Sequence, residues 1–131
     1  MDYLEKINIG HCRSERKLIK KEKKHLSRVV STCEFQNYIK WDKSRAVRDG
    51  EYCHEMLKLF QKIGGVRNKS SIPGCENYVG CCAEQHAANA LVITCPAIGK
   101  KYENINFSNA RRARTLEIIK PCKNCKMLFN L

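Results

Sequence analysis

Three cysteines and one glutamate supply the residue types that metal-assisted hydrolysis requires. The chain carries Cys82-Ala83-Glu84 and, forty positions after Cys82, the run Pro121-Cys122-Lys123-Asn124-Cys125. Three cysteine ligands leave the fourth position of a tetrahedral zinc ion open for water, whereas structural sites fill all four positions with protein. Zinc makes hydroxide available at neutral pH, and a nearby carboxylate can carry its protons. The pattern therefore predicts zinc on Cys82, Cys122 and Cys125, with Glu84 as proton shuttle.

Two other uses of the cysteines also fit the spacing. A Cys-x-x-Cys pair alone is shared by redox motifs and zinc ribbons. A closed, purely structural site could use Cys75 with Cys81 or Cys82, together with Cys122 and Cys125, which would leave Glu84 as an ordinary helix carboxylate. The nine cysteines are an odd number, which favours a reduced chain with a metal site over a secreted disulfide scaffold.

The same motifs carry a resemblance to a known family. Zinc nucleobase deaminases combine a three-ligand site, a glutamate that is not a ligand, and a Pro-Cys-x-x-Cys second half. Residues 75–91 and 105–129 resemble the cytidine deaminase-like superfamily, within roughly residues 50–131. The stretch Asn-Ala-Arg-Arg-x-Arg-Thr at 109–115 is similar to the YwqJ-like deaminases at the C-termini of bacterial polymorphic toxins.

The resemblance implies an α/β fold of three layers, with a small central sheet flanked by helices. It also implies zinc on the three cysteines, Glu84 as proton shuttle, and a substrate-binding asparagine about a dozen residues before the first ligand. Asn68 is fourteen residues before Cys82, and Asn77 is the fallback. A toxin domain would be delivered to act in the cytoplasm of a target cell and would have a cognate immunity protein. The chain stops six residues after Cys125, which predicts a sheet that lacks the superfamily's last strands.

The charge of the chain predicts a polyanionic partner. The formal net charge is +12, and nucleic acid is favoured over an anionic membrane. Arg111, Arg112 and Arg114, with the lysines at 120, 123 and 126, are expected to form a phosphate-contacting rim near Cys122. The alternative is a solvated strand edge that charge protects from aggregation. Tyr78, Tyr102 and Phe107 are candidates for stacking on a base, and His86 is expected to be a packed helix residue.

Three functions follow, in order of preference. The first is a zinc-dependent deaminase that converts cytosine to uracil in DNA or RNA. The second keeps the chemistry but acts on a free nucleoside, a nucleotide or an adenine-type base. The third is a zinc-stabilised basic module that binds nucleic acid without catalysis.

The 131-residue chain contains no apolar run long enough to span a membrane, and its N-terminus does not have the layout of a secretory signal.

The apolar pattern predicts the elements that must position these residues. Residues 1–48 are expected to form a basic helical extension, with an amphipathic helix over 16–30 and a second helix over 34–43 that buries Trp41. The deaminase domain would span 49–131. Within it, helices are predicted over 51–63 and 82–92 and after Pro121. Short strands are predicted within 66–79 and over 104–107 and 115–119.

Overall fold

The protein has a small antiparallel sheet with helices on both faces. The computed structural model describes residues 2–22 and 28–131. The strands are β1 (Val29–Phe35), β2 (Tyr38–Lys43), β3 (Asn106–Phe107), β4 (Ala110–Arg112) and β5 (Ile118–Ile119). They lie in the order β2-β1-β4-β5, and β3 also pairs with β1. The predicted α/β class, a small sheet flanked by helices, is confirmed, and the sheet draws strands from both sides of residue 48.

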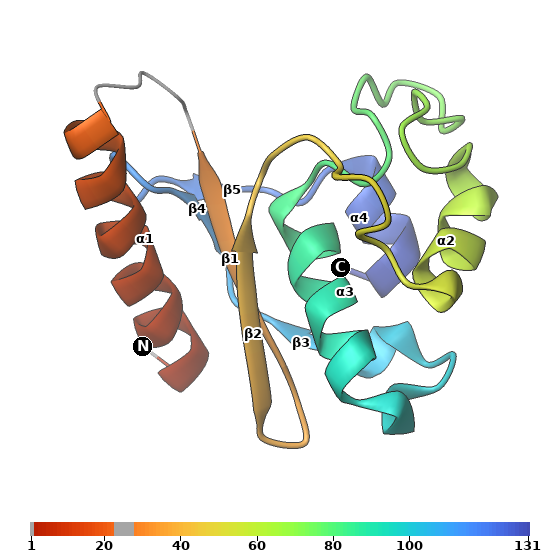
Figure 1. Ribbon diagram of the computed structural model, residues 1–131, viewed down its shortest axis with the longest axis horizontal. Helices are drawn as coiled ribbons and strands as arrows, with labels where there is room; N and C mark the ends of the chain where they lie inside the picture. The colour runs from red at the N-terminus through yellow and green to blue at the C-terminus, as the bar shows by residue number, and fades with distance from the viewer. Residues whose placement is uncertain (1, 23–27) are drawn as a thin grey trace.

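The helices divide between the two faces. Helix α1 (Tyr3–Glu22) covers one face, and α3 (Ala83–Thr94) covers the other (Figure 1). Helices α2 (His54–Phe60) and α4 (Lys123–Phe129) lie on the same side of the sheet as α3 (Figure 1). Three short 3-10 turns follow α2 and α3: η1 (Gln61–Ile63), η2 (Pro96–Ile98) and η3 (Tyr102–Asn104). No described helix has the length and apolar character needed to cross a membrane.

The helix predicted over 16–30 is confirmed as far as Glu22, where α1 ends, and is wrong at Val29 and Val30, while the helix predicted over 34–43 is wrong. Helix α1 starts at Tyr3, and residues 29–35 and 38–43 instead form the β1–β2 hairpin. Gln36 and Asn37 both have positive φ, 48° and 70°, as the tight hairpin turn requires. Trp41 is only half-buried and stacks on His11 with ring centroids 4.2 Å apart. Residues 23–27 of the first predicted helix lie outside the described residues.

The main core lies between the sheet and the helices of the α3 side. The predicted helix over 51–63 is observed from His54 on, as α2 and η1. The apolar residues on one side of this segment are buried: Tyr52, Met56, Leu59, Phe60 and Ile63. The helix predicted over 82–92 is α3, where alanines 83, 87 and 88 are buried and allow close packing. The helix predicted after Pro121 is α4.

Helix α1 is held to the sheet mainly by buried polar contacts. The apolar cluster at this interface contains only Cys12, Val30 and Ala113 as buried members. Asn8 is fully buried, and its amide donates to the carbonyls of Val30 and Asn109 at 3.1 and 2.9 Å. Its oxygen accepts a hydrogen bond from the Thr32 hydroxyl at 2.8 Å. Both the amide nitrogen and the oxygen of Asn8 are therefore hydrogen-bonded, and these contacts fix α1 to β1.

The late strands were predicted in outline only. β3 and β5 fall inside the predicted runs 104–107 and 115–119, but each has two residues, and β4 was missed. Residues 67–70 and 77–79 pair through Arg67 N to Val79 O, Val79 N to Asn68 O, and Ser70 N to Asn77 O. This segment, the 67–79 hairpin, has one ladder bridge, between Lys69 and Tyr78, instead of the predicted short strands.

Candidate metal centre and catalytic site

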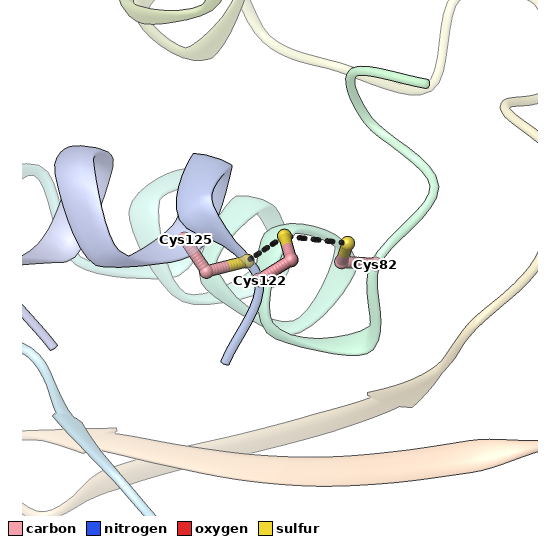
Figure 2. Close-up of side chains that lie close together, drawn as sticks. All are labelled: Cys82, Cys122 and Cys125. Atoms are coloured by element: carbon pink, nitrogen blue, oxygen red, sulfur yellow. Dashed lines mark hydrogen bonds between the residues drawn. The ribbon is translucent and has the colours of Figure 1, made fainter. Parts of the chain in front are cut away.

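Two helix starts bring the three predicted ligands together. Cys82 is the N-cap of α3 and Cys122 is the N-cap of α4, and Cys125 lies in the first turn of α4. The sulfur of Cys122 is 3.4 Å from that of Cys82 and 3.8 Å from that of Cys125 (Figure 2). Thiolates that hold zinc tetrahedrally at about 2.3 Å are about 3.8 Å apart. The spacing of the three sulfurs is therefore compatible with a zinc site.

The cluster contains three cysteines and no fourth. Among the described Cys, His, Asp and Glu side chains, only Cys82, Cys122 and Cys125 bring their sulfurs within 4.8 Å of one another at this place. Cys75 and Cys81, the partners that a closed site would need, are outside this group. The arrangement favours the open, three-ligand form of the site.

Glu84 shares a cavity with two of the cysteines. The cavity has a volume of about 400 Å³ and reaches from the cluster to the surface. Its wall is made by Val29, Ser44, Glu76, Asn77, Tyr78, Cys81, Cys82, Ala83, Glu84, Ala110, Ile119, Lys120 and Cys122. Glu84 is 6% exposed, and burial, with the negative charge of Cys122 adding to it, raises its pKa to about 7. Such a carboxyl group both accepts and releases protons near neutral pH.

Charge within the thiol cluster is concentrated on its central member. Hydrogen bonds with Cys125 and Cys82 lower the pKa of Cys122 far below that of a free thiol. The same hydrogen bonds with Cys122 raise the pKa of Cys82 and of Cys125, and burial adds to both shifts. Both N-caps also lie at the positive ends of helix dipoles, which favour thiolates. The donor set is soft and preorganised, with one thiolate at Cys122, and a bound zinc ion would displace the protons of the other two thiols.

The predicted substrate-binding asparagine and its fallback lie in different places. Asn68 is exposed and donates its amide to the carbonyl of Gly64 at 2.8 Å, and it is not among the residues that line the cavity. Asn77 lines the cavity, and its side chain forms a hydrogen bond with Cys122. Tyr78, the next residue of the 67–79 hairpin, also lines the cavity and is 52% exposed.

The three predicted arginines are not part of the cavity wall. Arg111 pairs with Glu5 of α1 at 3.3 Å and donates to the carbonyl of Leu116 at 3.1 Å. Arg112 pairs with Glu117 at 3.2 Å. Arg114 is exposed. Of the cations predicted for the rim, Lys120 is the one that lines the cavity.

Sequence reasoning missed several residues of the wall. Ser44 follows β2, so no pattern could place it here once residues 34–43 were assigned to a helix. Glu76 is brought to the wall with Asn77 and Tyr78 by the pairing of the 67–79 hairpin. The one usable signal was the upstream asparagine that the resemblance supplied. Asn68 is nearer to the expected distance but lies outside the wall, whereas the fallback Asn77, five residues before Cys82, lines it.

A second group of possible metal ligands already has a cation. Asp42, Glu51 and His86 lie close enough to hold an ion. However, the Arg45 guanidinium contacts Glu51 through two nitrogens, at 2.8 and 2.6 Å, and Asp42 at 3.0 Å. His86 is buried, with its ring nitrogens 2.7 Å from Glu51 Oε2 and 2.9 Å from the carbonyl of Arg45. These contacts make the group an internal ion-pair network, and His86 is the packed helix residue that was expected.

No protein-family model, no curated protein and no solved structure matches the chain. The functional assignment therefore depends on the residues of the site and their geometry.

Proposed function

We propose that the protein is a zinc-dependent hydrolytic deaminase that converts cytosine to uracil in nucleic acid. The observation that carries the proposal is the open thiol cluster of Cys82, Cys122 and Cys125, which shares one cavity with the buried carboxyl of Glu84. A structural zinc site needs neither an open coordination position nor a neighbouring carboxyl group with a raised pKa.

In the proposed mechanism, Cys82, Cys122 and Cys125 would hold zinc as thiolates, and the cavity would admit the base. The bound metal would supply hydroxide at neutral pH. Glu84 would take one proton from the attacking water and pass it to the ring nitrogen of cytosine. It would then carry the proton of the hydroxyl group formed on the ring carbon to the amine, which leaves as ammonia while the carbonyl of uracil forms. Because Glu84 is almost fully buried, bulk water does not compete for these protons.

The wall of the cavity supports a nucleobase as substrate. Tyr78 presents an exposed aromatic ring on which a base could stack, and Asn77 offers an amide that could read the base or its sugar. Lys120 provides a cation for a phosphate. The net charge of +12 would draw a polyanion toward the molecule. The resemblance of the motifs to toxin deaminases extends the proposal to delivery into a target cell and to neutralisation by an immunity protein.

A second candidate is deamination of a free nucleoside, nucleotide or adenine-type base. It is favoured by the ion pairs of Arg111 with Glu5 and of Arg112 with Glu117, which reduce the cationic surface available to a phosphate chain. The two candidates differ in their response to salt. Each phosphate contact makes polymer binding weaken as ionic strength rises, while binding of a free nucleoside or base, which carries no phosphate, is hardly affected.

The test is a substrate panel with a matched variant. The zinc-loaded protein is incubated with single- and double-stranded DNA and RNA, and with free nucleosides and nucleotides, and products are read by sequencing and mass spectrometry. We expect uracil from cytosine in a polymer, and a loss of about 10²- to 10⁴-fold in rate for Glu84→Gln with zinc content unchanged. Equal activity of this variant, or no deamination of any substrate, would refute the proposal.

A further inference from the structure

Gln85 connects the two halves of the cysteine cluster. Its side chain is fully buried and lies next to the residue proposed to move protons. The amide nitrogen donates to the sulfur of Cys125 on α4 at 3.5 Å. The amide oxygen accepts a hydrogen bond from the backbone N–H of Gly80 at 2.7 Å. One side chain of α3 therefore contacts both a proposed ligand on α4 and the turn that leads into Cys82.

The turn at Gly80 gives this connection a rigid support. Gly80 has a φ of +96°, and a Cβ at this position would lie 2.9 Å from the side chain of Val47. The Tyr52 hydroxyl donates to the Gly80 carbonyl at 2.5 Å. These contacts hold the Gly80 backbone in place. Because the Gly80 N–H can only donate, the amide oxygen of Gln85 must face it, and the amide nitrogen is then directed at the sulfur of Cys125.

We propose that Gln85 is a positioning residue that fixes Cys125 relative to Cys82 and tunes the metal through an N–H···S hydrogen bond. This inference rests on the proposed zinc site. A hydrogen bond to a ligating thiolate reduces the electron density that the sulfur donates, and it fixes the direction of the sulfur lone pairs. Three thiolates near one carboxylate would otherwise concentrate negative charge in a buried place, which a neutral donor partly relieves.

The inference is tested by Gln85→Met, which keeps the length of the side chain and removes the amide. We expect zinc affinity, measured by competition with a chromophoric chelator, to fall by about 10- to 100-fold. With cobalt(II) in place of zinc, the thiolate-to-metal charge-transfer band should move to lower energy, because the sulfur of Cys125 loses its donor. A purely structural role for Gln85 would not move this band.

Asn89→Leu is the matched control. Asn89 is a buried amide one turn further along α3, and it also joins two backbone groups, the N–H of Cys53 and the carbonyl of Glu51. It contacts no cysteine of the cluster. We expect Asn89→Leu to lower stability while leaving the zinc affinity of the folded protein and the cobalt band unchanged.

Gln85→Glu is a second test variant. It retains an acceptor for the Gly80 N–H but replaces the group that donates to the sulfur by a carboxylate. It should weaken zinc binding at least as much as Gln85→Met does.

The outcomes separate this inference from the proposed function. If the unchanged protein does not bind one zinc ion, the proposed metal centre fails, and this inference fails with it. If the unchanged protein binds zinc but Gln85→Met and Gln85→Glu bind it with the same affinity and the same cobalt spectrum, only the role of Gln85 is overturned. Reduced affinity in both Gln85 variants, together with a normal Asn89→Leu control, would support the inference.

Discussion

At the scale of single residues, the three cysteines of the candidate metal centre differ in their exposure to solvent. Cys125 is completely buried, whereas Cys82 and Cys122 are partly exposed and line the cavity. Cys125 would therefore hold a metal ion from the interior, and the other two cysteines line the cavity through which a substrate would enter. Cys75 is partly exposed and outside the cluster, which makes it a natural control.

We expect Cys125→Ser to lose stoichiometric zinc, because a serine hydroxyl is a poor substitute for a thiolate ligand. Cys75→Ser should retain one zinc ion per chain. Zinc content is measured by elemental analysis after exhaustive dialysis of the purified proteins. Loss of zinc in the Cys75 variant would indicate that the site is closed by a fourth cysteine.

The cysteines of the candidate metal centre could be predicted from the sequence because each motif is short. Cys82 with Glu84, and Cys122 with Cys125, are neighbours in the sequence, and only the meeting of the two motifs depends on the fold. The surroundings of the arginines were not predictable in this way. The partner of Arg111 is Glu5, which is 106 residues away in the sequence. Only the docking of α1 on the sheet brings these two charges together.

At the scale of elements, an ion-pair network joins the segment before α2 to α3. Glu51 contacts Arg45 and His86, and its carboxylate also accepts a hydrogen bond from the backbone N–H of Arg48 at 3.0 Å. Burial acts to raise the pKa of Glu51, but the hydrogen bonds from Arg45 and Arg48 and the charge of His86 outweigh it and lower the pKa to about 2. The folded state therefore favours the ionised carboxylate.

This network predicts a loss of stability in acid. A carboxylate whose pKa is lowered by folding contributes stability above its unfolded pKa, here 4.5, and this contribution is lost as the pH falls toward about 2. Denaturant unfolding at a series of pH values should show Glu51→Gln to be less stable than the unchanged protein at pH 7. The difference should shrink between pH 4.5 and 2, at up to about 1.4 kcal/mol per pH unit. A constant difference across this range would contradict the assignment.

The elements that periodicity predicted well are the helices that pack on the core through one apolar face. Tyr52, Met56, Leu59 and Phe60 repeat at helical intervals and are buried as expected. The β1–β2 hairpin was mistaken for helix because Val29 and Val30 fit either period, and Gln36-Asn37 is not a strong turn signal. Its pairing with β4, some eighty residues further along the chain, is a long-range contact that no local pattern contains.

At the scale of the whole molecule, zinc would join parts that are distant in the sequence. Cys82 begins α3, while Cys122 and Cys125 lie in the last helix. A ligand that binds only the folded state stabilises it according to its concentration relative to its Kd. We expect zinc to raise the free energy of unfolding by about 4 kcal/mol when free zinc is about 1,000 times the Kd.

Thermal unfolding with and without a strong chelator measures this effect. The Tm of the unchanged protein should fall when the chelator is added, and the Tm of Cys125→Ser should not respond to it. Re-addition of zinc in excess should restore the original Tm. An equal response of the two proteins would mean that any bound zinc is held elsewhere in the chain.

The burial of α3 constrains how this protein can diverge. From Ala83 to Asn89 every side chain is enclosed, so the helix that carries Glu84 and Gln85 has no surface in this stretch on which a mutation would be neutral. The 67–79 hairpin, by contrast, places Glu76, Asn77 and Tyr78 in exposed positions at the mouth of the same cavity. Exchange of residues is therefore expected to be tolerated at these three hairpin positions, while this stretch of α3 stays nearly invariant.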